Sequence, residues 1–271
     1  LSGMDLTGTI LTEADLTNSV LADMNLTGTI LTQANFTNAI MSNDVLFENN
    51  FAYSVFNGVD FSGKDLSYSN FQYASFDNAN LENIYSRDST FIQVDFTKIK
   101  NKSLAGSDLT YASFAHSNLS GVNLSGVILG ETNFWKANLS GVDFTAVSNT
   151  SIEESVFIET NLSDSNFQGV DLSSDGIYTT TFKNKAHLRN LSAIDIIETL
   201  FDKSTNKLLI SGEVRGNDLV ISYVVFNTFS QANLENANFK NADLRRVGFQ
   251  SANLTNANLE GANLQGALLD N

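Results

Sequence analysis

Residues 231–271 read QANLENANFKNADLRRVGFQSANLTNANLEGANLQGALLDN, and this stretch decides the fold. A large apolar residue recurs at every fifth position, and in each unit a small residue precedes it by two positions. Neither the 3.6-residue period of an α-helix nor the two-residue period of a strand produces this spacing. A fixed short period of this kind indicates a repeat architecture, in which each unit packs against its neighbours.

Each five-residue unit predicts a short extended segment followed by a corner. Residues two apart on an extended chain point to the same side, so the small and the large side chain both face inward. The Asn or Asp between them faces outward, and the remaining two residues turn the chain into the next side. Alternating small and large side chains fill a narrow interior without voids. Stacked coils then lie about 4.8 Å apart and pair through backbone hydrogen bonds.

The unit Ala-(Asp/Asn)-Leu-x-x, as in Ala232-Asn233-Leu234 and Ala242-Asp243-Leu244, resembles the repeat of the pentapeptide-repeat family. The match covers most of the chain. The resemblance implies an all-β fold, a right-handed quadrilateral β-solenoid with four units in each coil. The spacing alone establishes neither the number of sides nor the hand.

The five-residue register extends over residues 1–182 with three irregularities. Ser86 occupies a position that a large apolar residue fills in other units, so we expect a local defect there that Tyr85 fills. The register slips by three residues near 98–102 and again near 148–151. Each slip predicts a corner that bulges outward without ending the stack.

The repeat pattern fails after Phe182, which predicts a small α/β insertion over residues 183–217. Ser192 followed by Asp195 is typical of a helix start, and apolar side chains then recur at helical spacing. A short amphipathic helix near 193–203 is therefore expected, with Ile194, Ile197 and Phe201 on its apolar face.

The end of the insertion and the return to the repeat are less distinct. Residues 207–214 and 219–225 are rich in β-forming side chains around a turn at 215–218, so both are expected to be extended. Because Leu219 and Val224 fit the five-residue register, we expect the solenoid to continue over residues 218–271.

The chain carries a net charge of −15, and two acidic blocks hold nearly all of it. Residues 1–63 and residues 137–182 each contain 7 acidic and no basic side chains. This charge argues against direct nucleic-acid binding, which needs a basic patch, and it favours solubility.

Other features of the composition limit which kinds of site the chain can form and where in the cell it can be located. The chain has no Cys, so it has neither disulfides nor thiolate metal sites. The longest apolar-rich run, residues 219–226, is far shorter than the roughly 20 residues that span a bilayer. No signal peptide is visible, so a cytoplasmic and a secreted location both stay open.

Catalysis finds no support in the sequence. No phosphate-binding, zinc or calcium motif is present, and the many Asp residues recur because the repeat places Asp or Asn there. His116 falls at an outward corner and is expected to be solvated. We therefore expect no catalytic residue, no cofactor and no metal site.

Outward aromatic side chains are the most specific surface feature. We call the large apolar residue of each unit its central residue. Tyr53 and Tyr73 each follow a central residue by two positions and lie twenty residues apart. With four units per coil they would stack on successive coils, and Trp135 would fall on the same face if each slip is a bulge. Such aromatics indicate either a partner interface or a ladder of rings that supports the solenoid. The candidate partner-binding residues are Tyr53, Tyr73, Trp135, Ile194, Ile197 and Phe201.

The leading functional hypothesis is a non-enzymatic scaffold that binds an unidentified protein partner through the insertion. The resemblance implies an alternative, because some family members mimic DNA and bind DNA gyrase or a related topoisomerase. Duplex DNA carries one charge per about 1.7 Å, whereas the 30 acidic residues here are spread over all faces and offset by 15 basic ones.

Two further expectations come from the sequons and the ends. Ten Asn-x-Ser/Thr sequons raise the possibility of a segment of an extracellular repeat protein. Neither end carries a polar cap of the kind that solenoids require, so self-association through open ends is expected.

Overall fold

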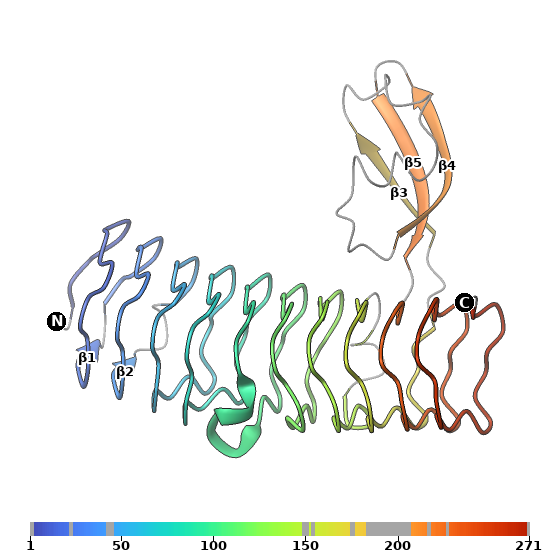
Figure 1. Cartoon of the computed structure of the whole chain (residues 1–271). Coiled ribbons are helices and arrows are strands. Elements are labelled where there is room, and N and C mark those ends of the chain that lie inside the picture. The colour runs from blue at the N-terminus through green and yellow to red at the C-terminus, as the bar shows by residue number, and fades with distance from the viewer. Residues whose placement is uncertain are drawn as a thin grey trace.

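The computed structural model describes residues 3–21, 24–41, 46–147, 152, 155–173 and 228–269, and the backbone of three strands between 177 and 225. The repeats form one stack of coils, with the N-terminal coils at one end and the C-terminal coils at the other (Figure 1). Parallel bridges join residues 20 apart, such as Asp5 with Asn25 and Ile10 with Ile30. Four five-residue units therefore complete each coil, which confirms the four-sided solenoid.

Backbone hydrogen bonds between coils hold the stack together. The N–H of Leu6 donates to the carbonyl of Asn25 at 2.9 Å, and the N–H of Asn25 donates to the carbonyl of Met4 at 3.2 Å. The strands β1 (Val20–Leu21) and β2 (Ile40–Met41) belong to the same pattern and pair in parallel. Each coil therefore pairs only with the coils directly before and after it.

The corners explain the polar residues of the repeat. The Thr9 N–H donates to the carbonyl of Leu6 at 3.0 Å, and Gly8 inside this turn has a φ of 65°. A positive φ at this position is typical of a type II turn and favours Gly or Asn. The carboxylate of Asp5 accepts the N–H of Thr7 at 3.0 Å, an arrangement that Asp and Asn make readily.

The interior is a column of large side chains from the central position of each unit. The phenylalanines among them are fully buried and stack from coil to coil, with ring centroids 5.1 Å apart for Phe51 and Phe71 and again for Phe71 and Phe91. Where the small position holds Ser or Thr, its hydroxyl bonds to the backbone, as Ser54 Oγ does to the Leu31 carbonyl at 2.6 Å.

Ser86 forms the expected defect, but Tyr85 does not fill it. The Ser86 side chain is fully buried among the large central residues, and its hydroxyl has no hydrogen-bond partner among the described residues. Tyr85 is 56% exposed. The expectation for Tyr85 was wrong because the residue before a central position points outward, as Tyr85 does in its bridges to Asp65 and Asp108.

Both register slips lengthen a coil by three residues. Tyr85 pairs with Asp108 and Asn133 with Val156, in each case 23 residues apart. At the first slip the extra residues form two 3-10 turns, η1 (Phe96–Lys98) and η2 (Lys100–Lys102), which bulge from the stack (Figure 1). Residues 148–151 at the second slip lie outside the described residues.

A longer interruption follows Ser173, so Val156 and Thr228 pair across 72 residues instead of 20. Within it lie three antiparallel strands, in the order β3-β5-β4, that stand outside the stack in Figure 1. Their bounds are β3 (Ile177–Phe182), β4 (Lys207–Arg215) and β5 (Asp218–Val225).

These strands confirm the extended segments near 207–214 and 219–225 but correct the boundaries of the insertion. The apolar residues of 177–182 and 218–225 fit the five-residue register and predict that both segments belong to the solenoid. In the structure β3 and β5 instead pair antiparallel with each other. The predicted helix near 193–203, with Ile194, Ile197 and Phe201, lies outside the described residues. Within the described part of the chain, no helix has the length and apolar character needed to cross a membrane.

Candidate partner-binding site

The outward residues just before the central positions form one row along each side of the solenoid, and we name the sides A to D by these rows. The other three rows contain aspartates: Asp15 lies in the row of side B, Asp60 in the row of side C and Asp65 in the row of side D. The row of side A contains no charged residue along its whole length, and ten bridges join it from end to end. Row A consists of Ile10, Ile30, Asn50, Asn70, Thr90, Ser113, Asn133, Val156, Thr228, Gly248 and Leu268.

Two tyrosines lie at the corner that follows side A. The rings of Tyr53 and Tyr73 stack with centroids 4.7 Å apart and planes 8° apart, and the side chains are 53% and 41% exposed. This confirms the predicted stack. Both residues have positive φ, 62° and 59°, where a residue other than Gly loses about 1 kcal/mol or more. The protein therefore holds two exposed rings at positions where Gly or Asn would be easier to accommodate.

Trp135 lies further along the same corner and is surrounded by polar side chains. The His116 ring meets it edge-on at 4.9 Å, and Lys136 Nζ lies 4.7 Å from its ring centre. Its indole Nε1 donates to Glu159 Oε1 at 3.3 Å, and Lys136 forms an ion pair with Glu159 at 3.3 Å. His116 is exposed at its corner, as expected, and it also contacts Trp135.

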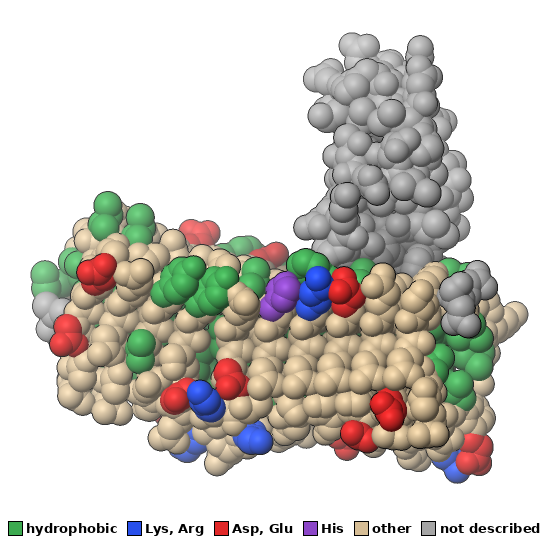
Figure 2. All heavy atoms as spheres, in the orientation of Figure 1, with side chains coloured by type: hydrophobic (Ala, Val, Ile, Leu, Met, Phe, Trp, Pro, Cys, Tyr) green, Lys and Arg blue, Asp and Glu red, His purple; other side chains and the backbone are tan. Residues whose placement is uncertain are grey.

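A groove of about 900 Å³ runs along this corner and the adjoining edge of row A. Tyr73, Gln93, His116, Trp135, Glu159 and Gln231 line it from the corner, and Ser113 and Asn133 line it from row A. The prediction that Trp135 falls on the same face as Tyr73 is confirmed. Figure 2 shows a histidine, a basic and an acidic side chain in sequence along one edge of the stack, with hydrophobic side chains beside them.

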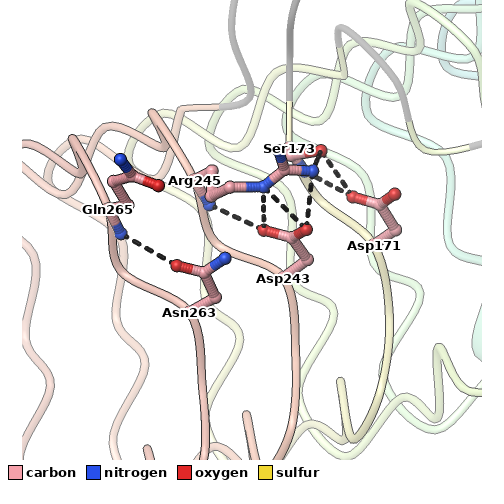
Figure 3. Close-up of polar contacts among 6 residues, drawn as sticks. All are labelled: Asp171, Ser173, Asp243, Arg245, Asn263 and Gln265. Atoms are coloured by element: carbon pink, nitrogen blue, oxygen red, sulfur yellow. Dashed lines mark hydrogen bonds and ion pairs between the residues drawn. The ribbon is translucent and has the colours of Figure 1, made fainter.

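A second polar cluster lies on side D and joins the coils on either side of the long interruption (Figure 3). Arg245 Nε donates to both carboxylate oxygens of Asp243, at 2.9 and 2.8 Å. Its Nη2 donates to Ser173 Oγ at 3.4 Å, and Ser173 Oγ donates to Asp171 at 2.7 Å. In the neighbouring coil the Gln265 N–H donates to Asn263 at 3.2 Å.

The environment of Asp243 sets its protonation. Partial burial alone would raise the pKa of Asp243, but the side-chain and backbone hydrogen bonds from Arg245, together with the guanidinium charge, lower it below its ordinary value. Asp243 and Arg245 are thus bound to each other and tie adjacent coils together, which is a structural role.

Ladders of amide side chains cover much of sides B and C, as on side C, where Asn238 donates to Asn166 at 3.0 Å and Asn258 to Asn238 at 3.3 Å. On side B, Asn138 donates to Asn118 at 3.1 Å, Asn161 to Asn138 at 2.9 Å and Asn233 to Asn161 at 3.2 Å. Across the described ranges, no three His, Asp or Glu side chains are grouped closely enough to hold a metal ion. Among the surfaces that the structure describes, the groove beside side A is therefore the best-formed candidate site.

Comparison with known proteins identifies the repeat. The model of the family described as pentapeptide repeats matches eight copies, at residues 5–43, 50–83, 90–126, 107–145, 146–174 and 228–266. No curated protein matches the chain.

Solved structures with the same repeat are distant in sequence. HetL, a pentapeptide repeat protein involved in heterocyst differentiation regulation from the cyanobacterium Nostoc sp. strain PCC 7120, is 20% identical, with coverage of 99% of this chain and 91% of that one and a TM-score of 0.28. Full-length QnrB1, a plasmid-mediated fluoroquinolone resistance protein, is 18% identical, with coverage of 89% and 94% and a TM-score of 0.30. Rfr23, a pentapeptide repeat protein from the cyanobacterium Cyanothece 51142, is 17% identical, with coverage of 62% and 87% and a TM-score of 0.25.

These scores are too low to support any argument from the individual neighbours. The family model, in contrast, matches more than half of the chain, and the coils close after every four units. The chain therefore belongs to the pentapeptide-repeat family and folds as its right-handed β-solenoid.

Proposed function

We propose that the protein is a non-enzymatic scaffold and that the segment between Ser173 and Thr228 is the element that recognises a protein partner. The observation that carries this proposal is the continuity of the stack across that segment. Val156 pairs with Thr228 and Asn166 with Asn238 as if the intervening residues were a simple corner. The solenoid does not need the inserted residues, so their presence favours a separate role in recognition.

The surface chemistry supports a binding role over catalysis. Glu159, the one carboxylate that lines the groove among the described residues, already accepts from Trp135 and pairs with Lys136. The outward aspartates of the repeat accept backbone N–H groups of their own corners, as Asp143 does from Thr145 at 2.9 Å. These hydrogen bonds give the carboxylates a role in holding the corners of the fold and the surroundings of Trp135. Members of the family are generally structural or interaction proteins.

The experiment that tests the proposal is a deletion of residues 175–226, which removes the 52 residues by which this coil exceeds the usual 20. We expect the far-ultraviolet circular dichroism spectrum to keep its β character and the variant to remain monodisperse. Proteins that cross-link to the intact chain in extracts of its source should no longer cross-link to the variant. A matched variant, Tyr68→Ala, changes an exposed side chain at the same corner in a distant coil and controls for general surface changes. Identical cross-linked proteins with and without residues 175–226 would contradict the proposal.

The arrangement of charge gives less support to a DNA mimic. Row A is uncharged, and on side D two aspartates are paired with arginines, Asp108 with Arg87 at 3.6 Å and Asp243 with Arg245 at 2.8 Å. A duplex presents phosphates continuously along its length. A supercoiling assay of DNA gyrase with titrated protein separates the two functions. We expect no inhibition even at large excess, and stoichiometric inhibition would favour the mimic.

A further inference from the structure

Side A differs from the rest of the surface in a way that the scaffold function does not explain. In a chain with a net charge of −15, its outward row is uncharged over ten coil-to-coil steps, about 48 Å at 4.8 Å per step. The groove of about 900 Å³ lies on the edge of this row, within the size range of small-molecule sites. We propose that this groove binds a neutral oligosaccharide, with the ring of Tyr73 as its stacking platform.

The charges around the groove favour a neutral ligand. No Lys or Arg is among the described residues that line it, and the cation beside it, Lys136, already pairs with Glu159, so an anionic ligand would have to break that pair in a strongly acidic protein. A cationic ligand would compete with Lys136, which already covers the Trp135 ring at 4.7 Å and pairs with Glu159. Binding an anion would therefore be opposed by the negative charge of the protein, and binding a charged group of either sign would compete with the Lys136–Glu159 ion pair.

The ring of Tyr73 lines the groove. One of its faces stacks on Tyr53 of the preceding coil, with planes only 8° apart, so the stacking direction follows the axis of the rod. In the next coil the exposed side chain of Gln93 takes the equivalent position. A sugar ring that moves this side chain aside would pack on the other face of Tyr73 inside the groove.

The remaining lining matches the two kinds of surface that a sugar presents. Ile92 and Ala115 supply apolar contacts, and Gln93, Ser113, Asn133 and Gln231 supply amide and hydroxyl groups that both donate and accept. A pyranose ring likewise has a face of C–H groups, which packs on aromatic rings, and a rim of hydroxyls. The coil spacing of about 4.8 Å is close to the length of one residue in an extended β-1,4-linked chain, so successive coils can meet successive sugars.

The test uses Trp135, the only tryptophan of the chain, as a reporter that lies in the groove. The intact protein is titrated with chitohexaose and cellohexaose, both neutral, and with chitosan hexaose and hexagalacturonate as charged counterparts. Isothermal titration calorimetry is run in parallel, so that binding without a change in emission is also detected. We expect saturable binding of at least one neutral hexasaccharide and at least tenfold weaker binding of the charged ones.

Two single variants locate the site. Tyr73→Ala should weaken binding at least tenfold, whereas Tyr68→Ala, which removes another exposed tyrosine from the corner before side A, should leave it unchanged. Thermal unfolding establishes that both variants are folded. Absence of both heat and emission change with every neutral hexasaccharide, or undiminished binding by Tyr73→Ala, would overturn the proposal. The deletion of residues 175–226 leaves the groove in place, so the sugar site and the protein-recognition function succeed or fail separately.

Discussion

Sides A and D are made of the same backbone but have opposite surface chemistry. Both rows are built from parallel bridges at the same intervals, such as Asn70 with Thr90 on side A and Asp65 with Tyr85 on side D. Side D carries aspartates and the arginines that pair with them, whereas side A is uncharged and borders the groove. The difference shows that the outward position of each unit can vary without any change in the coil, so the surface chemistry of a side is set independently of the interior column.

The largest effect is expected where an interior residue is removed. Phe71 lies behind side A, is fully buried, and stacks on Phe51 and Phe91. Phe71→Ala should lower the free energy of unfolding by about 3–5 kcal/mol, because it leaves a cavity between two rings. Chemical denaturation monitored by circular dichroism measures the change, and Gln72→Ala on the adjacent corner is the matched control. A loss comparable to that of the control would show that stability does not reside in the interior column.

A smaller effect of opposite sign is expected behind side D. Ser86→Ala should raise the free energy of unfolding by about 1 kcal/mol, because it removes a buried hydroxyl that has no partner. Ser89→Ala should lower it by about 1 kcal/mol, because that hydroxyl donates to the Leu66 carbonyl at 2.7 Å. Urea denaturation of the two variants side by side tests the pair, and changes of the same sign would contradict the assigned hydrogen bonding.

Removing the tyrosine stack at the corner of side A should change stability little. Tyr73→Ser loses one exposed ring pair, which is worth about 0.5–1.5 kcal/mol, and it relieves no buried contact. Differential scanning calorimetry is the measurement, with Tyr53→Ser expected to give the same small shift. A drop as large as that of Phe71→Ala would mean that the rings are a structural ladder and not an exposed binding surface.

The smallest effect concerns the charge pair on side D. The folded-state pKa of Asp243 lies below its ordinary value of 3.8, so the ionised form favours the folded state. This contribution is present above the ordinary pKa and is lost as the pH falls through the lowered one. Asp243→Asn should therefore cost about 0.2–1 kcal/mol at neutral pH and reduce the loss of stability on acidification. Denaturation midpoints between about pH 5 and pH 2 give both slopes, and parallel slopes would show that the pair contributes nothing.

Much of the fold could be predicted because one spacing rule governs most of the chain. The five-residue period gave the inward and outward positions, and counting through the first slip placed Trp135 on the corner of Tyr73. The contact of His116 with Trp135 was not predicted. Trp135 follows the central residue Phe134 by one position, and its indole ring contacts His116 of the preceding coil. The five-residue register predicts which side a residue lies on, but it does not predict which side chains of neighbouring coils touch.

The boundaries of the insertion could not be found from the period alone. Ile177 and Phe182 lie five residues apart, as do Leu219 and Val224, so both pairs fit the register by coincidence. Of their outward positions only Asp218 holds the Asn or Asp of the repeat, and the run Tyr178-Thr-Thr-Thr181 is rich in residues that favour strands. That local composition was the available signal for β3 and β5.

The join at Val156 and Thr228 has a consequence for protein engineering. In other coils two residues form the corner before side A, whereas here a long segment is inserted at it. After Thr228 the parallel bridges of all four rows continue in the same register. The entropy of closing a loop grows only logarithmically with its length, so a corner of this rod is a tolerant acceptor for foreign domains. Domains inserted at equivalent corners of different coils would be separated along the axis by multiples of about 4.8 Å.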